Sequence, residues 1–283
     1  MVYYFPVLGA MALALGTILE RIVLKIRKIN VKEYQTASFF AIVLALVPLV
    51  YFFWRLDSPA LETENVLIFA LVIFFSIIAN LFVFYSLKWE KVNILEPARV
   101  LEPLFIILLA IIFSFFAENL YERNIKVIAP ALIASFALVF SHIKRHHLSF
   151  NKYFIAAILG SFFFALELVI SRLILDFYSP ITFYFLRSSS IFLLSFFIFR
   201  PNFKGIKTKT AGLIFITGVI WVIYRLIVYY GYLQLGVIST TLLLMLGPIF
   251  IYALAHFILK EKMSWKNFVV AIIIVSSIIY ALI

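Results

Sequence analysis

Long apolar runs, separated by short polar connections, limit the folds that are open to this chain. Most runs have the roughly 20 residues that an α-helix needs to cross a bilayer, whereas barrel strands are about half as long. The runs therefore predict an all-α polytopic membrane protein. We expect ten transmembrane helices, at about residues 3–24, 34–54, 65–87, 93–116, 125–142, 152–175, 181–199, 210–233, 237–259 and 267–283.

The amino-acid composition agrees with this class. Of the 283 residues, 65% are hydrophobic and 13% are charged, whereas a soluble domain is about half apolar and a quarter charged. The connections are too short to contain a soluble domain. The chain has no cysteine, so disulfides and thiol chemistry are excluded.

The two halves of the chain match each other when one is laid over the other. The matched pairs, in order, are Gly9 with Gly160, Arg21 with Arg172, Tyr85 with Tyr230, Pro103 with Pro248 and Glu118 with Glu261. Because one half holds five helices, the second half would enter the membrane from the opposite side. We therefore expect two inverted-topology repeats, residues 1–143 and 152–283, joined by a basic loop at 144–151.

The stretch Asn93–Phe105 carries charges and prolines into a predicted membrane helix. Glu96, Arg99 and Glu102 are spaced by three residues, so they are neighbours on its surface. Pro103 removes a backbone donor, which leaves a carbonyl without its helical partner. Such groups are tolerated mainly where they face protein or a water-filled cavity. The stretch is therefore a candidate lining for a transport pathway.

Among the charged residues of the predicted spans, six are candidates for the membrane interior, and their formal charges cancel. They are Glu96, Arg99, Glu102, Glu167, Arg187 and Arg225. One interpretation is that ion pairs join the helices, and the other is that the charges line a polar cavity for a substrate. We expect Glu102, Glu167 and Arg225 to border one central cavity, with Arg99 at its cytoplasmic end. Glu96 and Glu20 lie near predicted ends and are assigned to the interface.

Two further polar residues and two prolines complete the candidate site. Asn80 is matched with Arg225 when the two halves are aligned, and it either binds substrate or joins helices. Tyr230 is a substrate-binding candidate whose alternative is packing. Pro103 and Pro248 are expected to bend their helices and to act as hinges, with the two helices facing each other across the repeat axis.

Sequence signals for an enzyme are absent. The only aspartates, Asp57 and Asp176, lie in predicted connections, and no Ser/His/Asp set, phosphate-binding glycine loop or zinc spacing occurs. No ATP-binding segment is present, so any pumping must use a gradient. We expect no enzymatic activity, no cofactor and no metal.

The segment Leu246–Ala271 resembles the closing signature of an EamA-type repeat. In that signature a proline follows a small residue, and a later glutamate opens a short turn into the last helix. Glu261 lies 13 residues after Pro248, the spacing associated with the family. Leu186-Arg187 resembles a recurrent arginine of the family, whereas the matching position in the second span holds Thr36, a departure.

This resemblance implies the drug/metabolite transporter superfamily, with ten helices in two inverted halves around a central cavity. Its substrates are diverse, so the resemblance does not select one. We expect a secondary active transporter in the plasma membrane that exports a small polar metabolite by alternating access. Its expected partners are the substrate, the lipid bilayer and protons as coupling ion, with a monomer or a homodimer as the assembly.

The mixture of positive and negative charges favours a zwitterion such as an amino acid. Arg225, Arg99 and Arg187 would contact an anionic group. Glu102 or Glu167 would exchange a coupling proton, because burial makes a carboxyl group easier to protonate. Two alternatives stay open: an organic-anion or nucleotide-sugar exchanger, and a non-transporting membrane scaffold or assembly subunit whose charges only fix packing.

Basic residues are distributed unevenly between the two sides of the predicted bundle. We name the side that holds the N-terminus side A and the opposite side side B. The side B connections carry 17 Lys and Arg residues, against 4 on side A. Such a bias marks the cytoplasmic side, and it accounts for the formal net charge of +11 without a nucleic-acid partner. We therefore place side B in the cytoplasm and both termini outside.

A reporter that is active only in the cytoplasm tests this orientation. Fused after Ile283, it should stay inactive, because side A faces outside. The same reporter inserted in the basic loop at 144–151 should be active and serves as the positive control. Activity at Ile283 would reverse the assignment and place both termini inside.

Overall fold

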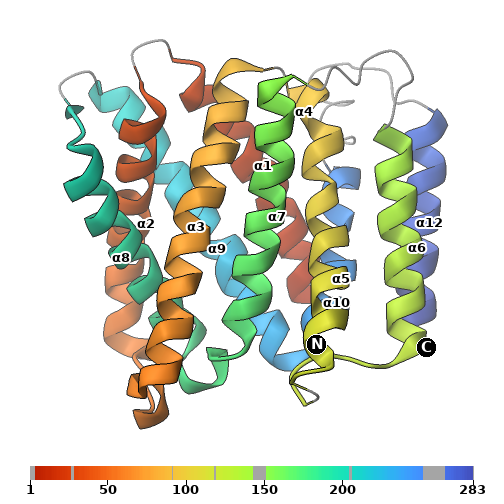
Figure 1. Cartoon of the computed structure of the whole chain (residues 1–283). Helices are drawn as coiled ribbons and strands as arrows, with labels where there is room; N and C mark the ends of the chain where they lie inside the picture. Colours follow the sequence, from red (N-terminus) through yellow and green to blue (C-terminus); the bar gives the residue numbers. More distant parts are fainter. Residues whose placement is uncertain are drawn as a thin grey trace.

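The computed structural model shows a bundle of helices that run side by side, up and down (Figure 1). It is 86% helical, and the part of the chain that it describes contains no strand. The structure describes residues 4–26, 29–90, 92–117, 119–142, 151–203, 206–250 and 265–282. Its helices are α1 (Tyr4–Leu24), α2 (Val31–Phe53), η1 (Ser58–Leu61), α3 (Thr63–Trp89), α4 (Val92–Arg99), α5 (Leu101–Ser114), α6 (Ile125–His142), α7 (Lys152–Arg172), η2 (Leu175–Phe177), α8 (Pro180–Phe199), α9 (Thr208–Gln234), α10 (Val237–Leu244) and α12 (Trp265–Leu282).

Apolar helices account for most of this bundle. Seven of the described helices are long and apolar enough to cross a membrane, and three shorter apolar helices accompany them, Ile125–Phe140, Val237–Phe250 and Phe268–Ala281. The all-helical class is confirmed, whereas the count of ten spans stays a prediction. For the spans that are described in full, each predicted end lies within three residues of the observed one.

Several predicted features lie outside the described residues. Of the connecting loop at 144–151, only Asn151 is described, and the predicted span 237–259 is described only to Phe250. The matched glutamates Glu118 and Glu261 also lie outside. The boundary between the two expected repeats therefore stays a prediction.

Helical hydrogen bonding is interrupted three residues before each of two prolines. Val100 separates α4 from α5 with φ −69° and ψ −6°, and Pro103 follows. Met245 ends α10 with φ −63° and ψ −7°, and Pro248 follows. In each case the proline has no N–H for the carbonyl four residues earlier, and its ring crowds that carbonyl. Bending and hinge motion at these positions stay predictions.

The helices pack in pairs that combine the two halves of the chain. α3 packs on α7 as α9 packs on α1, and α5 packs on α7 as α10 packs on α1. The pairs α2–α8 and α6–α12 form the left and right edges of the bundle in Figure 1. These pairs stay the same when α1, α2, α3, α5 and α6 are exchanged for α7, α8, α9, α10 and α12, whereas the contacts of α1 with α3 and of α6 with α10 have no counterpart of similar extent.

Glycines allow the closest approaches between these paired helices. A Cβ atom at Gly160 of α7 would lie 2.6 Å from Val83 Cγ2 and 3.2 Å from the Val83 backbone nitrogen on α3. A Cβ atom at Gly218 of α9 would lie 3.0 Å from Ala41 Cβ on α2. Small residues that bring helix backbones together are typical of membrane interfaces.

A polar contact joins the two halves at the lower end of Figure 1, which is side A. Leu56 and Tyr178 form an isolated antiparallel bridge, in which the Asp57 N–H donates to the Phe177 carbonyl at 2.9 Å and the Ser179 N–H to the Arg55 carbonyl at 3.1 Å. We call residues 55–57 and 177–179 the side-A latch. The Arg55 side chain also binds Asp57 at 2.9 Å, and this exposed ion pair adds little to the stability.

Packing at Gly160 predicts sensitivity to a single methyl group. Gly160→Ala should lower the free energy of unfolding by about 1–2 kcal/mol, because overpacking against the α3 backbone outweighs the gain in helix propensity. Thermal unfolding of the detergent-solubilised protein measures the change. Gly212→Ala is the matched control, because a Cβ atom there meets nothing within 4 Å. Equal unfolding temperatures for the two variants would contradict this account of the α3–α7 contact.

Candidate functional site

A buried carboxylate joins three helices near the centre of the bundle. Glu167 on α7 is 0% exposed. Its Oε1 lies 3.0 Å from Nε of Arg187 on α8, and its Oε2 lies 3.2 Å from Nη1 of Arg225 on α9. Two arginines and one carboxylate leave a net positive charge at this point. A group of this kind is expensive in a membrane interior unless its members are paired.

Neighbouring side chains hold this cluster in place. The Tyr229 hydroxyl donates to Glu167 Oε1 at 3.1 Å, and Nη2 of Arg187 donates to the Ser76 hydroxyl. The guanidinium of Arg225 lies over the Phe164 ring, 5.3 Å from its centroid. These contacts from α3, α7 and α9 fix the orientation of both guanidinium groups.

Both arginines line a cavity between the halves. Its volume is about 60 Å³, and its wall includes five charged residues, Glu20, Arg99, Glu102, Arg187 and Arg225. The rest of the wall consists of Ser38, Asn80, a few aliphatic side chains and several aromatic residues, among them Phe39, Phe84, Phe164, Trp221 and Tyr224. Sites for small molecules usually have roughly 300–1,000 Å³, so the cavity has to widen before it holds a metabolite.

The structure brings most of the predicted site residues to this cavity. Arg99, Glu102, Arg187, Arg225 and Asn80 line it. The Asn80 amide donates to the Ser76 carbonyl of the preceding turn at 2.7 Å.

Glu167 and Tyr230 are placed differently from the prediction. Glu167 is not part of the cavity wall, because it lies behind the two arginines that it binds. Tyr230 is 41% exposed and packs its ring on Phe5, 5.8 Å away. Its neighbour Tyr229 is the inward-facing residue, since successive residues of a helix point in different directions. Glu96, assigned to the interface, has a side chain outside the described residues.

Glu20 is the functional candidate that the sequence did not identify. It lies close to the end of an apolar run and was assigned to the interface, but it is buried and lines the cavity. The spacing of Gly16, Thr17 and Glu20, which places small and polar residues on one helix face, is the signal that indicates it.

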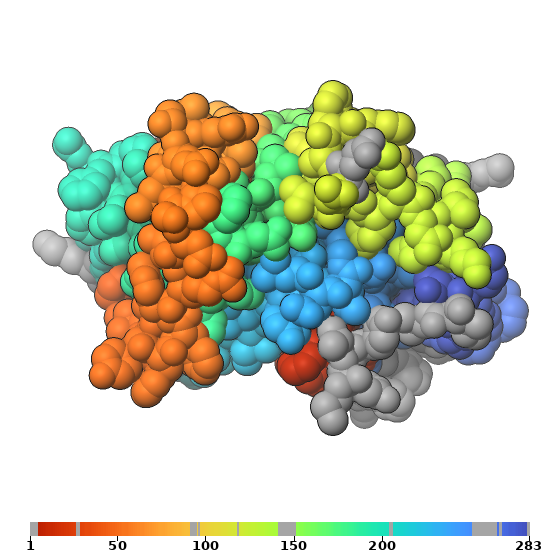
Figure 2. Space-filling model, turned by 90° about the horizontal axis from the view of Figure 1, so that it is seen from below, coloured from red at the N-terminus to blue at the C-terminus, as the bar shows by residue number. Residues whose placement is uncertain are grey.

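Aromatic rings close the bundle between the ion cluster and side A. The Phe183 ring contacts Tyr229 at 5.1 Å, Tyr178 at 5.3 Å and Phe69 at 5.6 Å between centroids. We call these four residues the aromatic plug. Tyr178 is shared with the side-A latch, so plug and latch are continuous. Seen from side A, the end of α9 and the start of α10 fill the middle of the face (Figure 2).

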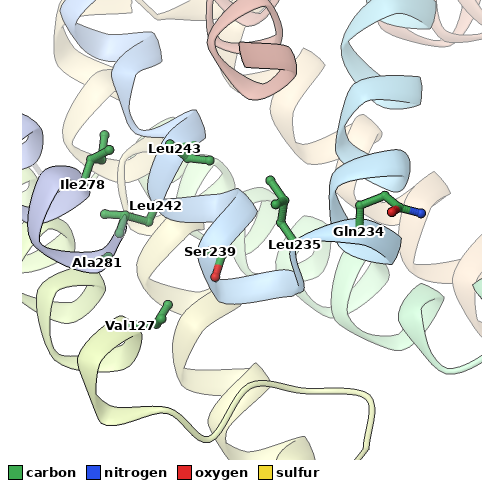
Figure 3. A pocket seen from close by; sticks show the side chains of 8 residues that line it. All are labelled: Val127, Gln234, Leu235, Ser239, Leu242, Leu243, Ile278 and Ala281. Carbon is green, nitrogen blue, oxygen red and sulfur yellow. The ribbon is translucent and has the colours of Figure 1, made fainter. Parts of the chain in front are cut away.

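A second pocket lies beside α10, nearer to side A. It has a volume of about 210 Å³ and is lined by Val127, Gln234, Leu235, Ser239, Leu242, Leu243, Ile278 and Ala281 (Figure 3). Its wall contains no charged residue. Close to it, the Glu122 carboxylate accepts the backbone N–H groups of Ile238 and Ser239 and fixes the first turn of α10. This pocket lacks the mixed charges of the central cavity.

The described residues contain no group of three His, Asp or Glu side chains that is arranged to hold a metal ion. The wall of the central cavity instead presents guanidinium, carboxylate, hydroxyl and aromatic groups. These groups recognise a polar organic molecule by charge and hydrogen bonding.

Comparisons with known proteins agree with this architecture. One crystal structure superposes on this chain with a TM-score of 0.66 at 16% sequence identity. The superposition covers 99% of this chain and 94% of the chain in that structure, which supports a shared fold. No curated protein sequence matches the chain. The model of the EamA-like transporter family matches residues 151–283. The second half of the chain is thus similar to the EamA-like transporter family, part of the drug/metabolite transporter superfamily.

Proposed function

We propose that this membrane transporter is a secondary active exporter of a small zwitterion, such as an amino acid. The observation that carries the proposal is the central cavity, whose wall presents both carboxylates and guanidinium groups. In a scaffold protein, buried charged residues serve only to join helices, as ion pairs that have no contact with a cavity. Here five charged residues meet at one cavity, which favours binding and transport over the scaffold.

The positive end of the cavity is suited to the carboxylate of the substrate. Among the described residues, Glu167 is the only carboxylate in ion-pair contact with Arg187 and Arg225, so further N–H groups of these arginines are available to an anionic group. Guanidinium groups donate paired hydrogen bonds that fit a carboxylate. In this proposal Glu167 is a positioning residue, which holds the arginines from behind without contacting the substrate.

Two acidic residues on the same wall argue against the organic-anion alternative. Glu20 and Glu102 would repel a dianion such as a nucleotide-linked sugar, whereas a zwitterion brings its own positive group. Glu102 is also a better candidate than Glu167 for exchanging a coupling proton, because both Glu167 oxygens are occupied by arginines.

Alternating access is supported by the way the two halves meet. The side-A latch and the aromatic plug close one end, and the paired packing of helices is the pattern expected of two inverted halves. We infer that the halves rock about the central cavity and that the latch separates when the cavity opens to side A. The interruptions before Pro103 and Pro248 provide helix ends that adjust during this motion.

Removing Arg225 should separate transport from folding. In Arg225→Ala, Glu167 keeps Arg187 as a one-to-one partner, so membrane yield should stay close to that of the unmodified protein. Transport of a labelled amino-acid mixture in proteoliposomes should fall roughly tenfold or more, because the anion contact is lost. Lys209→Ala, an exposed change on the same helix, is the control.

Glu167→Gln gives the opposite result in the same experiment. It leaves two buried arginines without a counter-ion, which costs about 3–5 kcal/mol, so its yield should fall. Normal transport by Arg225→Ala would remove this residue from the site, and a collapse of its yield would favour the packing role.

The side-A latch predicts that a single crosslink stops transport. Leu56 and Tyr178 occupy a non-hydrogen-bonded antiparallel position, where Cα atoms are about 4.5 Å apart and a disulfide fits. The chain has no cysteine, so Leu56→Cys/Tyr178→Cys introduces the only pair. Oxidation should abolish transport in proteoliposomes, and dithiothreitol should restore it.

The two single-cysteine variants are the controls for this crosslink. They should transport equally with and without oxidant. Full transport by the crosslinked protein would show that these residues act as a pivot and stay together throughout the cycle.

A further inference from the structure

Glu20 is a buried carboxylate that has Arg99 within electrostatic range but forms no ion pair or hydrogen bond with any described residue. It is 3% exposed, and among the described residues its oxygens have no hydrogen bond and no ion pair. Glu102, which is half-buried on the same cavity wall, has none either. Glu167, in contrast, has an arginine on each oxygen. A buried carboxylate is normally matched by a positive or hydrogen-bonding group, so both residues have room for a cationic partner from the cavity.

An indole ring lies against the helix face that carries Glu20. A Cβ atom at Gly16 would lie 3.3 Å from the Trp221 ring, so this glycine allows the indole of α9 to approach α1 closely. Gly16 and Glu20 are one turn apart on the same face of α1. Trp221 and Glu20 line the same cavity. The carboxylate and the aromatic ring therefore belong to one continuous wall.

The charged residues at the cavity form two adjoining groups. Arg187 and Arg225 with Glu167 have a net charge of +1. Glu20 and Glu102 with Arg99 have a net charge of −1. Glu102 interacts electrostatically with Arg225 as well as with Arg99, so the two groups meet at this residue and their charges sum to zero. Arg99 donates through Nη2 to the Thr17 hydroxyl at 3.3 Å, so it is directed toward the α1 face next to Glu20.

We propose that Glu20 and Glu102 form a subsite for one ammonium group, with Trp221 beside it. The proposal rests on the proposed function and specifies which end of the cavity takes the cationic group of the substrate. An ammonium group is attracted both to carboxylates and to the face of an indole. The carboxylate of the same molecule then faces Arg187 and Arg225 at the positive end.

Three probes with the same hydrocarbon part test this subsite. L-leucine has both charged groups, 3-methylbutylamine has only the ammonium group, and 4-methylpentanoate has only the carboxylate. Thermal unfolding of the purified full-length protein is followed with each probe, since a compound that binds the folded state raises the unfolding temperature. All three should stabilise the unmodified protein, and L-leucine should do so most.

Variants then assign each probe to an end of the cavity. Glu20→Gln and Glu102→Gln should each remove roughly half or more of the shift with 3-methylbutylamine and leave the shift with 4-methylpentanoate. Arg225→Ala should do the reverse. Glu64→Gln, an exposed change in the first turn of α3, is the matched control and should respond as the unmodified protein does.

Each other outcome overturns a defined part of the proposal. An amine shift that survives Glu20→Gln and Glu102→Gln overturns the subsite while leaving the zwitterion transporter intact. A response to 4-methylpentanoate alone overturns the subsite and favours an organic-anion substrate or a proton as the occupant of the acidic pair. Absence of a response to all three probes overturns the proposed zwitterion function and the subsite with it.

Discussion

One carboxylate bound by two arginines is the interaction on which the centre of this bundle depends. Glu167 draws α7, α8 and α9 together, and neither Arg187 nor Arg225 is stable in an apolar interior without it. Glu167 does not by itself neutralise two guanidinium groups, and both arginines reach the cavity wall. In the proposed function, the contact that stabilises the helices therefore also prepares a place for an anion.

Side chains form a continuous path from this cluster to the side-A surface. Tyr229 donates to Glu167 and packs on Phe183, Phe183 packs on Tyr178, and Tyr178 pairs with Leu56 in the latch. A separation of the latch would change the surroundings of the Glu167 hydrogen bond. This path gives the proposed gating motion a physical route to the arginines, because packed side chains move together rather than independently.

Helical hydrogen bonding is interrupted in the same way in both halves of the chain. Val100 and Met245 have nearly the same backbone angles, and each precedes a proline by three residues. The missing N–H group and the crowded carbonyl are properties of the proline itself and favour the interruption. They do not decide it alone, because Pro48 lies inside the uninterrupted helix α2. The partners of the two interrupted helices do not follow from local sequence, because α5 packs on α7 whereas α10 packs on α1.

The sequence by itself determined the helical class, the positions of the helices and most of the charged residues of the cavity. Apolar runs fix helix boundaries by length, and a charge within such a run has to face protein or water, which pointed to Arg99, Glu102, Arg187 and Arg225. Only the tertiary structure decided that Tyr229 and not Tyr230 faces inward, that Glu167 lies behind the wall, and that Glu20 lines the cavity. Depth along a helix can be counted from residues, but the direction in which a side chain points is set by the helices that pack around it.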